Sequence, residues 1–403
     1  LSKYSESFMM NKLEFLLLIV VLVAGCNNSN KNSLKVKYAD GVYAHRIDPN
    51  QSIDISSGQL KNIRFVPLEA TQSSLVGNIL KLDKDSTTGF WYILDANNPY
   101  KLFIFDNDGN FVKDIEHHGN GPGEYSSIND FYLSDGKWIE ILDGNTHRLI
   151  RYDLKIDTLL IEKNLPFHTY KYSYLDDGNY VFYKNVQAKN FEDEKYHYTL
   201  LVVDSTMNVK QKAFPLNLDK GINISISNPR GLFKTEVGVI FNNFNADTVY
   251  LVNSKTIRPL HILDFGNYTV PEPKDIEFSS SQEYLNYFTQ NKEKIAGAKR
   301  LVDTQKYFSF IFLYKNDLYY YFYEKDQDEA YIIDEIKFGS NEAFFPPPVE
   351  HIDSMFVSIY TLEMLIDKIT IENLKQGSDF YNAILEGKKS QNPILVSYQL
   401  NVQ

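Results

Sequence analysis

The chain is almost without cysteine: its 403 residues include only Cys26. A lone cysteine can form neither an internal disulfide nor a zinc site built from several thiolates. Basic residues are also too few for a nucleic-acid-binding protein, since 41 Lys and Arg stand against 52 Asp and Glu, for a net charge of −11. Such a surface repels a phosphate backbone. We therefore expect no nucleic acid partner.

Familiar catalytic motifs are missing as well. The sequence holds no H-E-x-x-H, G-x-S-x-G or P-loop pattern, and its histidines are scattered. Residues Asp106 to Asn110, DNDGN, resemble the start of a calcium loop. They lack the spaced ligands and the bidentate glutamate that such a loop needs, and a hairpin turn explains them. We predict no metal site, no cofactor and no catalytic residue.

Aromatic residues, in contrast, are abundant, with 29 Tyr and 27 Phe. Flat aromatic rings pack well on half-buried pleated surfaces, so this composition favours strands. With 43% hydrophobic and 23% charged residues, the chain has the composition of a folded protein.

The N-terminus has the pattern of an export signal. Residues 13–24, LEFLLLIVVLVA, are apolar but too short to span a bilayer, and Val23-Ala24-Gly25 lead directly to Cys26. This pattern is typical of a bacterial lipoprotein signal, in which the thiol of Cys26 receives a lipid. A plain secretory signal and an uncleaved anchor are the alternatives. We predict upstream residues and a signal peptide over 1–25, a lipidated tether over 26–40 and a folded domain over 41–403.

The predicted tether also bears on location. No acidic residue follows Cys26 before Asp40. Acidic residues at that point direct some lipoproteins of gut anaerobes to the cell surface. The sequence therefore favours the periplasmic face of the envelope, with the outer membrane as the anchoring membrane.

An internal repeat runs through the middle of the chain. Ile93-Leu94-Asp95 and Ile141-Leu142-Asp143 stand 48 residues apart, and Asp106 and Asp153 stand 47 apart in the same two segments. Turns containing glycine at 89, 136 and 178 each open a strand-like run. A period in the forties with several short strands is the signature of a β-propeller blade.

The repeat units predict the number of blades. Five units start near Leu75, Ile128, Tyr170, Ser225 and Ala298, and a sixth must combine strands from the two chain ends. Candidates for that sixth unit are 63–68, 354–360 and 393–400. We therefore predict an all-β fold: a closed six-bladed β-propeller with four-stranded antiparallel blades.

Two segments have helical rather than strand periodicity. Residues 281–300 and 362–385 both place apolar side chains at helical spacing, which predicts two short amphipathic insertions. Packing on the flank of the propeller is one interpretation, and a lid or a partner-binding helix is the other.

Several short motifs together resemble a known family. They are Val66-Pro67-Leu68-Glu69, Gly119-Asn120-Gly121-Pro122-Gly123-Glu124-Tyr125, Asp247-Thr248-Val249-Tyr250, Leu263-Asp264-Phe265-Gly266 and Asn392-Pro393-Ile394-Leu395-Val396-Ser397-Tyr398. The chain resembles the six-bladed β-propeller lipoproteins of Bacteroides-type bacteria, an NHL-like family with few assigned activities. The resemblance implies the fold and the lipid anchor, and it carries no catalytic residue.

The stretch HHGNGPGEY, residues 117–125, is the most distinctive of these motifs. Its glycines have the wrong spacing for a dinucleotide fingerprint, and Pro122 lacks the amide that a phosphate nest would use. The stretch fits better as a crossing between two blades, where glycine supplies unusual dihedrals. Such crossings lie at the funnel end of a propeller, so His117, His118, Glu124 and Tyr125 form a candidate pocket.

These observations leave two hypotheses of function. The first is an envelope-anchored, non-catalytic module that binds a glycan, a peptide or an envelope protein and contacts the membrane through its lipid. The second is a propeller-type hydrolase, lactonase or lyase with a metal in the central channel. The sequence favours the binding module, because no acidic residue recurs at inner-strand positions. The side chains at the channel mouth discriminate between the two.

Overall fold

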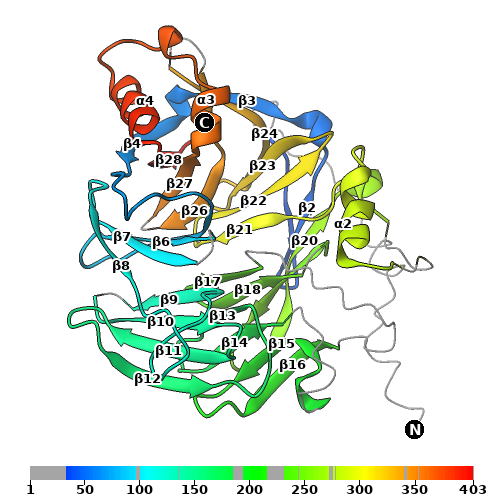
Figure 1. The fold of residues 1–403 in the computed structure, drawn as a ribbon. Coiled ribbons are helices and arrows are strands. Elements are labelled where there is room, and N and C mark those ends of the chain that lie inside the picture. Colours follow the sequence, from blue (N-terminus) through cyan, green and yellow to red (C-terminus); the bar gives the residue numbers. More distant parts are fainter. Residues whose placement is uncertain are drawn as a thin grey trace. The chain divides into compact units, whose positions relative to one another are not determined.

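The computed structural model describes residues 33–402 apart from 97–99, 135, 185–193, 216–230, 244, 272–275, 277, 340–342 and 353. The predicted signal peptide and Cys26 lie outside the described residues. Within them, the strands form six sheets, each built on four antiparallel strands (Figure 1). The predicted six-bladed β-propeller is confirmed.

The first three blades follow one another along the chain. Blade 1 consists of β5 (Ile79–Lys84), β6 (Trp91–Asp95), β7 (Lys101–Phe105) and β8 (Phe111–Ile115). Blade 2 consists of β9 (Asp130–Ser134), β10 (Trp138–Asp143), β11 (Arg148–Asp153) and β12 (Leu159–Asn164). Blade 3 consists of β13 (Lys171–Tyr174), β14 (Tyr180–Tyr183), β15 (Tyr198–Val203) and β16 (Val209–Pro215).

The next two blades carry additional strands at their outer edges. Blade 4 consists of β17 (Leu232–Thr235), β18 (Gly238–Asn242), β19 (Thr248–Val252) and β20 (Ile257–Asp264). Blade 5 consists of β21 (Lys299–Asp303), β22 (Tyr307–Tyr314), β23 (Asp317–Glu324) and β24 (Glu329–Phe338), followed by β25 (Ala343–Phe345).

Blade 6 closes the ring by joining the two ends of the domain. Its strands are β26 (Pro348–Ile352), β27 (Met355–Tyr360), β28 (Ile394–Leu400) and, from the N-terminal side, β4 (Leu60–Pro67). The closing pair β28–β4 is antiparallel, with Leu395 opposite Val66. The innermost strands β5, β9, β13, β17, β21 and β26 contact one another in turn around the axis. The three segments predicted for the sixth unit are thus confirmed, and β26 completes it.

Burial explains why the middle strands are so apolar. Every residue of β6 and of β18 is buried. A strand between two stacked blades is covered on both faces, and such strands consist of nearly continuous hydrophobic runs. The outermost strand β12 is mostly exposed instead, because only one of its edges is paired.

The N-terminal segment follows the rim before it enters blade 6. Strand β1 (Lys37–Ala39) pairs with β2 (Val42–Arg46), and β2 lies parallel to β20 of blade 4. Strand β3 (Ile53–Ser56) lies parallel to β24 of blade 5. Leu34 already exchanges two backbone hydrogen bonds with Ala330. Residues 34–40, expected to belong to the tether, are therefore already part of the folded body.

The helices are shorter than the sequence periodicity predicts. Helix α2 (Ser281–Gln290) ends well before residue 300, and the second segment divides into α3 (Leu362–Asp367) and α4 (Asp379–Ser390). Ser378 caps α4 by accepting a hydrogen bond from the Tyr381 N–H, so the helix begins there anew. Phe380 of α4 stacks 5.3 Å from Phe65 of β4, so this helix packs on blade 6.

Aspartates of the repeat hold the turns between the third and fourth strands. Asp106 accepts hydrogen bonds from the N–H groups of Asp108 and Asn110, both at 2.9 Å. Asp153, its partner in the repeat, accepts from Lys155 and Ile156. These are side-chain-stabilised turns. The resemblance of residues 106–110 to a calcium loop is therefore explained by hairpin geometry.

Candidate functional site

The glycine-rich stretch folds around its own glutamate. The carboxylate of Glu124 accepts a hydrogen bond of 2.8 Å from the Gly121 N–H. A Cβ on Gly119 would collide with the same carboxylate. Gly123 has a φ of +71°, a conformation that glycine adopts cheaply. The loop is thus a small anion cradle, and the anion that it holds belongs to the loop itself.

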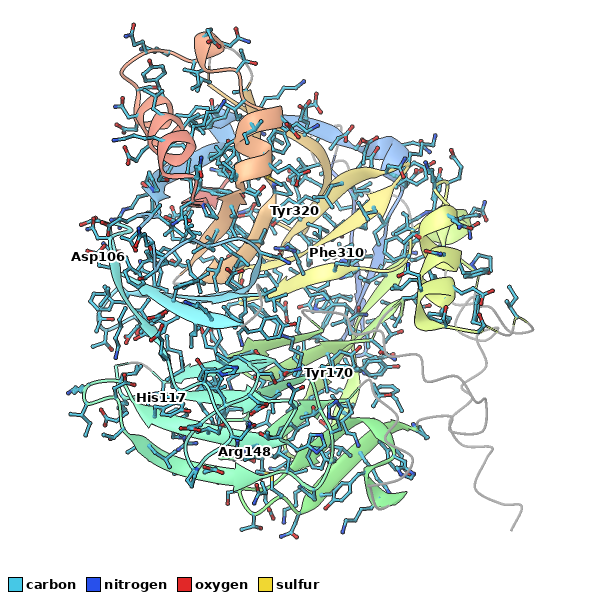
Figure 2. All side chains as sticks on the ribbon, viewed as in Figure 1. Asp106, His117, Arg148, Tyr170, Phe310 and Tyr320 are labelled. Atoms are coloured by element: carbon cyan, nitrogen blue, oxygen red, sulfur yellow. The ribbon has the colours of Figure 1, made fainter. Side chains whose placement is uncertain are left out.

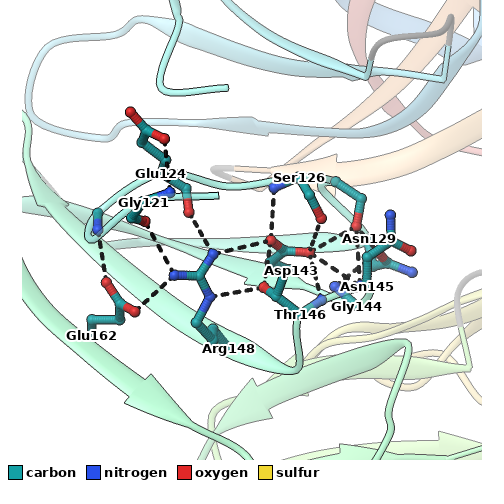
Figure 3. Close-up of polar contacts among 12 residues, drawn as sticks. Gly121, Glu124, Ser126, Asn129, Asp143, Gly144, Asn145, Thr146, Arg148 and Glu162 are labelled. Atoms are coloured by element: carbon teal, nitrogen blue, oxygen red, sulfur yellow. Dashed lines mark hydrogen bonds and ion pairs between the residues drawn. The ribbon is translucent and has the colours of Figure 1, made fainter. Parts of the chain in front are cut away.

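A buried arginine ties this loop to blade 2 (Figure 3). Arg148, at the start of β11, donates to the carbonyls of Gly121 and Glu124 and to the carboxylate of Glu162. Glu162 in turn accepts from the Gly123 N–H, and these two hydrogen bonds lower its pKa. Arg148 of β11 and Glu162 of β12 pair with each other, and both bond backbone groups of the crossing loop. The network therefore fixes the approach of the chain to blade 2.

In blades 1 and 2, the last residue of the second strand also anchors the loop that leads into the blade. Asp143 ends β10 and accepts hydrogen bonds from Ser126, Ser127 and Thr146. Burial alone would raise its pKa, but these hydrogen bonds keep the pKa of Asp143 below its ordinary value. Asp95 ends β6 and accepts from the N–H groups of 77 and 78. The repeat found in the sequence thus carries the loop anchors as well as the strands.

The predicted pocket residues lie beside blade 2, where Figure 2 labels His117 and Arg148. His117 stacks on Tyr152 at 4.5 Å and contacts Asp157 through Nε2 at 3.1 Å. The Tyr125 hydroxyl donates to the Ile115 carbonyl inside the protein. His118 is exposed. None of the four predicted residues is among those lining the cavities described next. Their role toward a ligand stays a prediction.

A cavity of about 220 Å³ lies on the propeller axis, lined by residues of all six inner strands. Its lining includes the buried carboxylate of Asp130 in β9. Lys81 donates to Asp130 at 2.8 Å, and Lys171 lies 4.0 Å away. Burial would raise the pKa of Asp130, but the two ammonium charges hold it below its ordinary value. The charge of the buried Asp130 carboxylate is thus compensated by two ammonium groups within the channel.

A wider groove of about 1160 Å³ continues from this cavity. The two share Phe233, Lys234 and His351. The groove lies at the C-terminal ends of the inner strands and passes between blades 5 and 6. Its lining residues are Lys61, Asp176, Phe233, Lys234, Thr235, Glu236, Asp303, Thr304, Gln305, Lys306, Tyr307, Glu324, Gln327, His351, Ser354, Phe356, Gln399, Leu400 and Asn401. We call it the radial groove.

His351 of β26 stands where the channel joins the radial groove. Burial lowers its pKa to about 4, so the imidazole is neutral at pH 7. Its Nε2 is buried and has no hydrogen-bond partner within the described part of the chain. A buried polar atom in this state calls for a specific explanation.

A buried chain of polar side chains connects the radial groove to the N-terminal strand β2. His45 bonds the Tyr321 hydroxyl at 2.8 Å and His261 at 2.9 Å. His261 Nε2 lies 3.6 Å from Asp303, a groove residue that Lys325 contacts at 2.6 Å. Burial lowers the pKa of both histidines, so both are neutral at pH 7. The cluster fixes Asp303 relative to the rim.

The side chains at the channel mouth address the two hypotheses of function. Among the described residues, no three His, Cys, Asp or Glu side chains gather closely enough to hold a metal ion. The groove carries aromatic rings, amide and hydroxyl groups, and three lysines and four carboxylates that are not clustered as metal ligands. No helix in the same part of the chain is long and apolar enough to cross a bilayer.

No sequence motif pointed to the radial groove, because its lining comes from blades 3, 4, 5 and 6. Residues as distant as Lys61 and Asn401 meet there through the closing blade. His351 is one of eight histidines and is flanked by ordinary strand residues. The sequence offers one weak indication of the groove: several of these residues stand at the C-terminal ends of the inner strands, next to hairpin turns.

Six sheets in a closed ring around a polar channel define the class: the protein is a six-bladed β-propeller. More narrowly, it belongs to the family described as domain of unknown function DUF4934, whose model matches residues 42–399. No curated protein matches the chain.

Two of the solved structures that match the chain come from Bacteroides species, and the first of them resembles the chain in fold. One is a Bacteroides fragilis protein thought to be exported, which is 18% identical with a TM-score of 0.67 over 86% of this chain and 99% of that one. Another, a Bacteroides caccae protein of unknown function, is 17% identical with a TM-score of 0.24 over 34% and 47% of the two chains. At these identities the first likeness shows the fold alone. The NHL-like affinity and the lipid anchor stay predictions.

Proposed function

We propose that the protein is a non-catalytic binding module of the bacterial cell envelope, and that its ligand lies in the radial groove. The observation that carries this proposal is the continuous hollow formed by the axial cavity and the groove, which share Phe233, Lys234 and His351. Binding sites are typically concave, with a few convergent polar groups on an aromatic lining. Phe233 and Tyr307 supply half-buried rings here.

A labelling experiment tests where the ligand binds. Because Cys26 is the only cysteine, a full-length Cys26→Ala chain accepts a single new thiol without ambiguity. In that background, Gln327→Cys places a thiol at the exposed rim of the groove, and Gln282→Cys places a matched one on helix α2. Coupling a bulky maleimide to residue 327 should abolish binding of any ligand found by array screening, and coupling to 282 should leave it intact. Equal binding after both modifications would refute the proposal.

The proposed location rests on the sequence of residues 13–26 and on the fold shared with a protein thought to be exported. Export as a lipoprotein through Cys26 would hold the propeller on the outer membrane, facing the periplasm. Two or more acyl chains anchor a protein stably, since each buried CH₂ contributes about 0.8 kcal/mol.

The anchor is testable by the mass of the mature protein. Mature chains should begin at residue 26 and carry fatty acid, and Cys26→Ala should remove both the lipid and the membrane fraction. Protease added to intact cells should leave the protein uncut if it faces the periplasm. An unmodified N-terminus elsewhere, or digestion on intact cells, would overturn the corresponding part of the placement.

A further inference from the structure

The radial groove differs from the rest of the protein in its charge. The whole chain has a net charge of −11. The groove lining contains three lysines and four carboxylates, which nearly balance. Lys234 pairs with Asp176 at 2.6 Å, and Lys325 pairs with Asp303 at the same distance. Local charges that are neutralised in this way offer little net attraction to an anionic or cationic ligand.

The remaining lining consists largely of neutral hydrogen-bonding groups. They are the amides of Gln305, Gln327, Gln399 and Asn401 and the hydroxyls of Thr235, Thr304 and Ser354. A primary amide offers two donors and an acceptor, and a hydroxyl offers both functions. Some of these groups also bond within the protein: Gln305 donates to Glu236, and Gln399 accepts from Asn62. Their remaining donor and acceptor positions match a ligand that itself presents many hydroxyls.

Apolar contact in the groove comes from rings rather than from aliphatic pockets. Phe356 and Leu400 are 1% and 4% exposed, so they belong to the core beneath the groove. Phe233 and Tyr307 are half-buried and reachable. The Tyr307 ring is held by Phe322 and Phe356 at 5.1 and 5.7 Å. A ring face carries partial negative charge and attracts the C–H groups that line the flat face of a pyranose.

From these features we infer that the ligand of the radial groove is a neutral oligosaccharide. The inference rests on the proposed function and specifies its ligand class. Tyr307 and Phe233 stack against sugar rings, and the amides of Gln327 and Gln305 bind ring hydroxyls. A volume of about 1160 Å³ exceeds the roughly 300–1,000 Å³ of ordinary small-molecule sites, which favours an oligomer over a single sugar. An extended peptide would instead need pockets for alternate apolar side chains.

The experiment is a calorimetric titration of the full chain with three panels: neutral oligosaccharides, uronic-acid oligosaccharides and uncharged peptides of similar length. We expect binding from the neutral panel alone, with little change in affinity when salt is raised. Tyr307→Ala and Gln327→Ala should each weaken it about tenfold or more. The matched controls Tyr100→Ala and Gln282→Ala, at exposed positions outside the groove, should not. Tyr307→Phe should retain most of the affinity, because the ring remains.

The outcomes separate the two proposals. Binding by peptides or acidic sugars that is abolished by the label at residue 327 would overturn the oligosaccharide assignment and leave the groove as the binding site. Neutral-sugar binding that survives this label would overturn the groove itself. If the folded wild-type protein binds no member of the neutral panel, the oligosaccharide inference is wrong.

Discussion

The glycine-rich loop and the radial groove are both rich in polar groups, but they differ in what those groups surround. The glycine-rich loop at 117–125 has a distinctive sequence, and its polar groups are consumed by interactions with blade 2. The radial groove has no distinctive sequence. Its polar groups also pair within the protein, as Gln305 does with Glu236 and Lys234 with Asp176, but they line a large hollow. The comparison teaches that a polar motif indicates a binding site only when it borders a space that a ligand can enter.

The loop should be the more costly region to damage. Arg148→Ala would leave the Glu162 carboxylate and two carbonyls without their donor in a site where the arginine side chain is only 9% exposed. Because Glu162 is itself exposed to solvent, the loss comes mainly from the carbonyls that lose their donor, and we expect about 1–3 kcal/mol. Denaturant unfolding should show this loss. The matched control is Arg64→Ala, whose exposed pair with Asp108 contributes about 0–1 kcal/mol. Equal losses would mean that the network does not hold the loop.

A smaller loss is expected from Gly119→Ala. The added Cβ would displace the exposed Glu124 carboxylate from its hydrogen bond with Gly121, and should destabilise the protein by about 1 kcal/mol. Combining it with Glu124→Ala should recover much of the loss, since the obstructing group is gone, and a double-mutant cycle measures this coupling. Gly58→Ala, where the nearest contact is an ordinary 3.7 Å, serves as the control. Strict additivity would show that Glu124 does not occupy the cradle.

The buried His351 beside the radial groove should make the free energy of unfolding depend on pH. The folded-state pKa of His351 lies near 4, below the value of about 6.5 in an unfolded chain. Between these values the unfolded chain binds more protons, so His351 makes stability fall as pH drops from about 6.5 towards 4. His351→Phe should lose this component, and its stability relative to wild type should improve over that window. Unfolding curves at neutral and acidic pH test this, and a constant difference between the two proteins would contradict it.

The smallest effect on stability is expected from Gln327→Ala, because this side chain is exposed. Its unfolding free energy should stay within about 0.5 kcal/mol of wild type. Its ligand affinity should fall nonetheless, as proposed for the radial groove. A variant that unfolds readily would show that the groove rim supports the fold.

The repeat made the architecture predictable from the sequence. Residues 93–95 and 141–143 recur because each second strand must be apolar on both faces and must end in an anchor for the incoming loop. The closing strands 393–400 and 63–68 could be recognised because a ring requires a partner for its last blade. These features are local or periodic, so one sequence suffices to reveal them.

The rest depends on contacts that no local pattern encodes. Strands β2 and β3 were missed because they are short and pair with β20 and β24, more than 200 positions away; β1 pairs only with β2. The radial groove was missed because it forms only when blades 3 to 6 are in place. The helix over 281–300 was predicted too long because periodicity continues where the chain already turns toward β21.

The most direct test compares thiol protection at the two regions. In the Cys26→Ala background, Gln327→Cys reports on the radial groove and His118→Cys reports on the glycine-rich loop, both at exposed positions. With saturating neutral oligosaccharide, we predict slower maleimide labelling at residue 327 and an unchanged rate at residue 118. Protection at residue 118 with none at 327 would contradict the account and return the site to the loop.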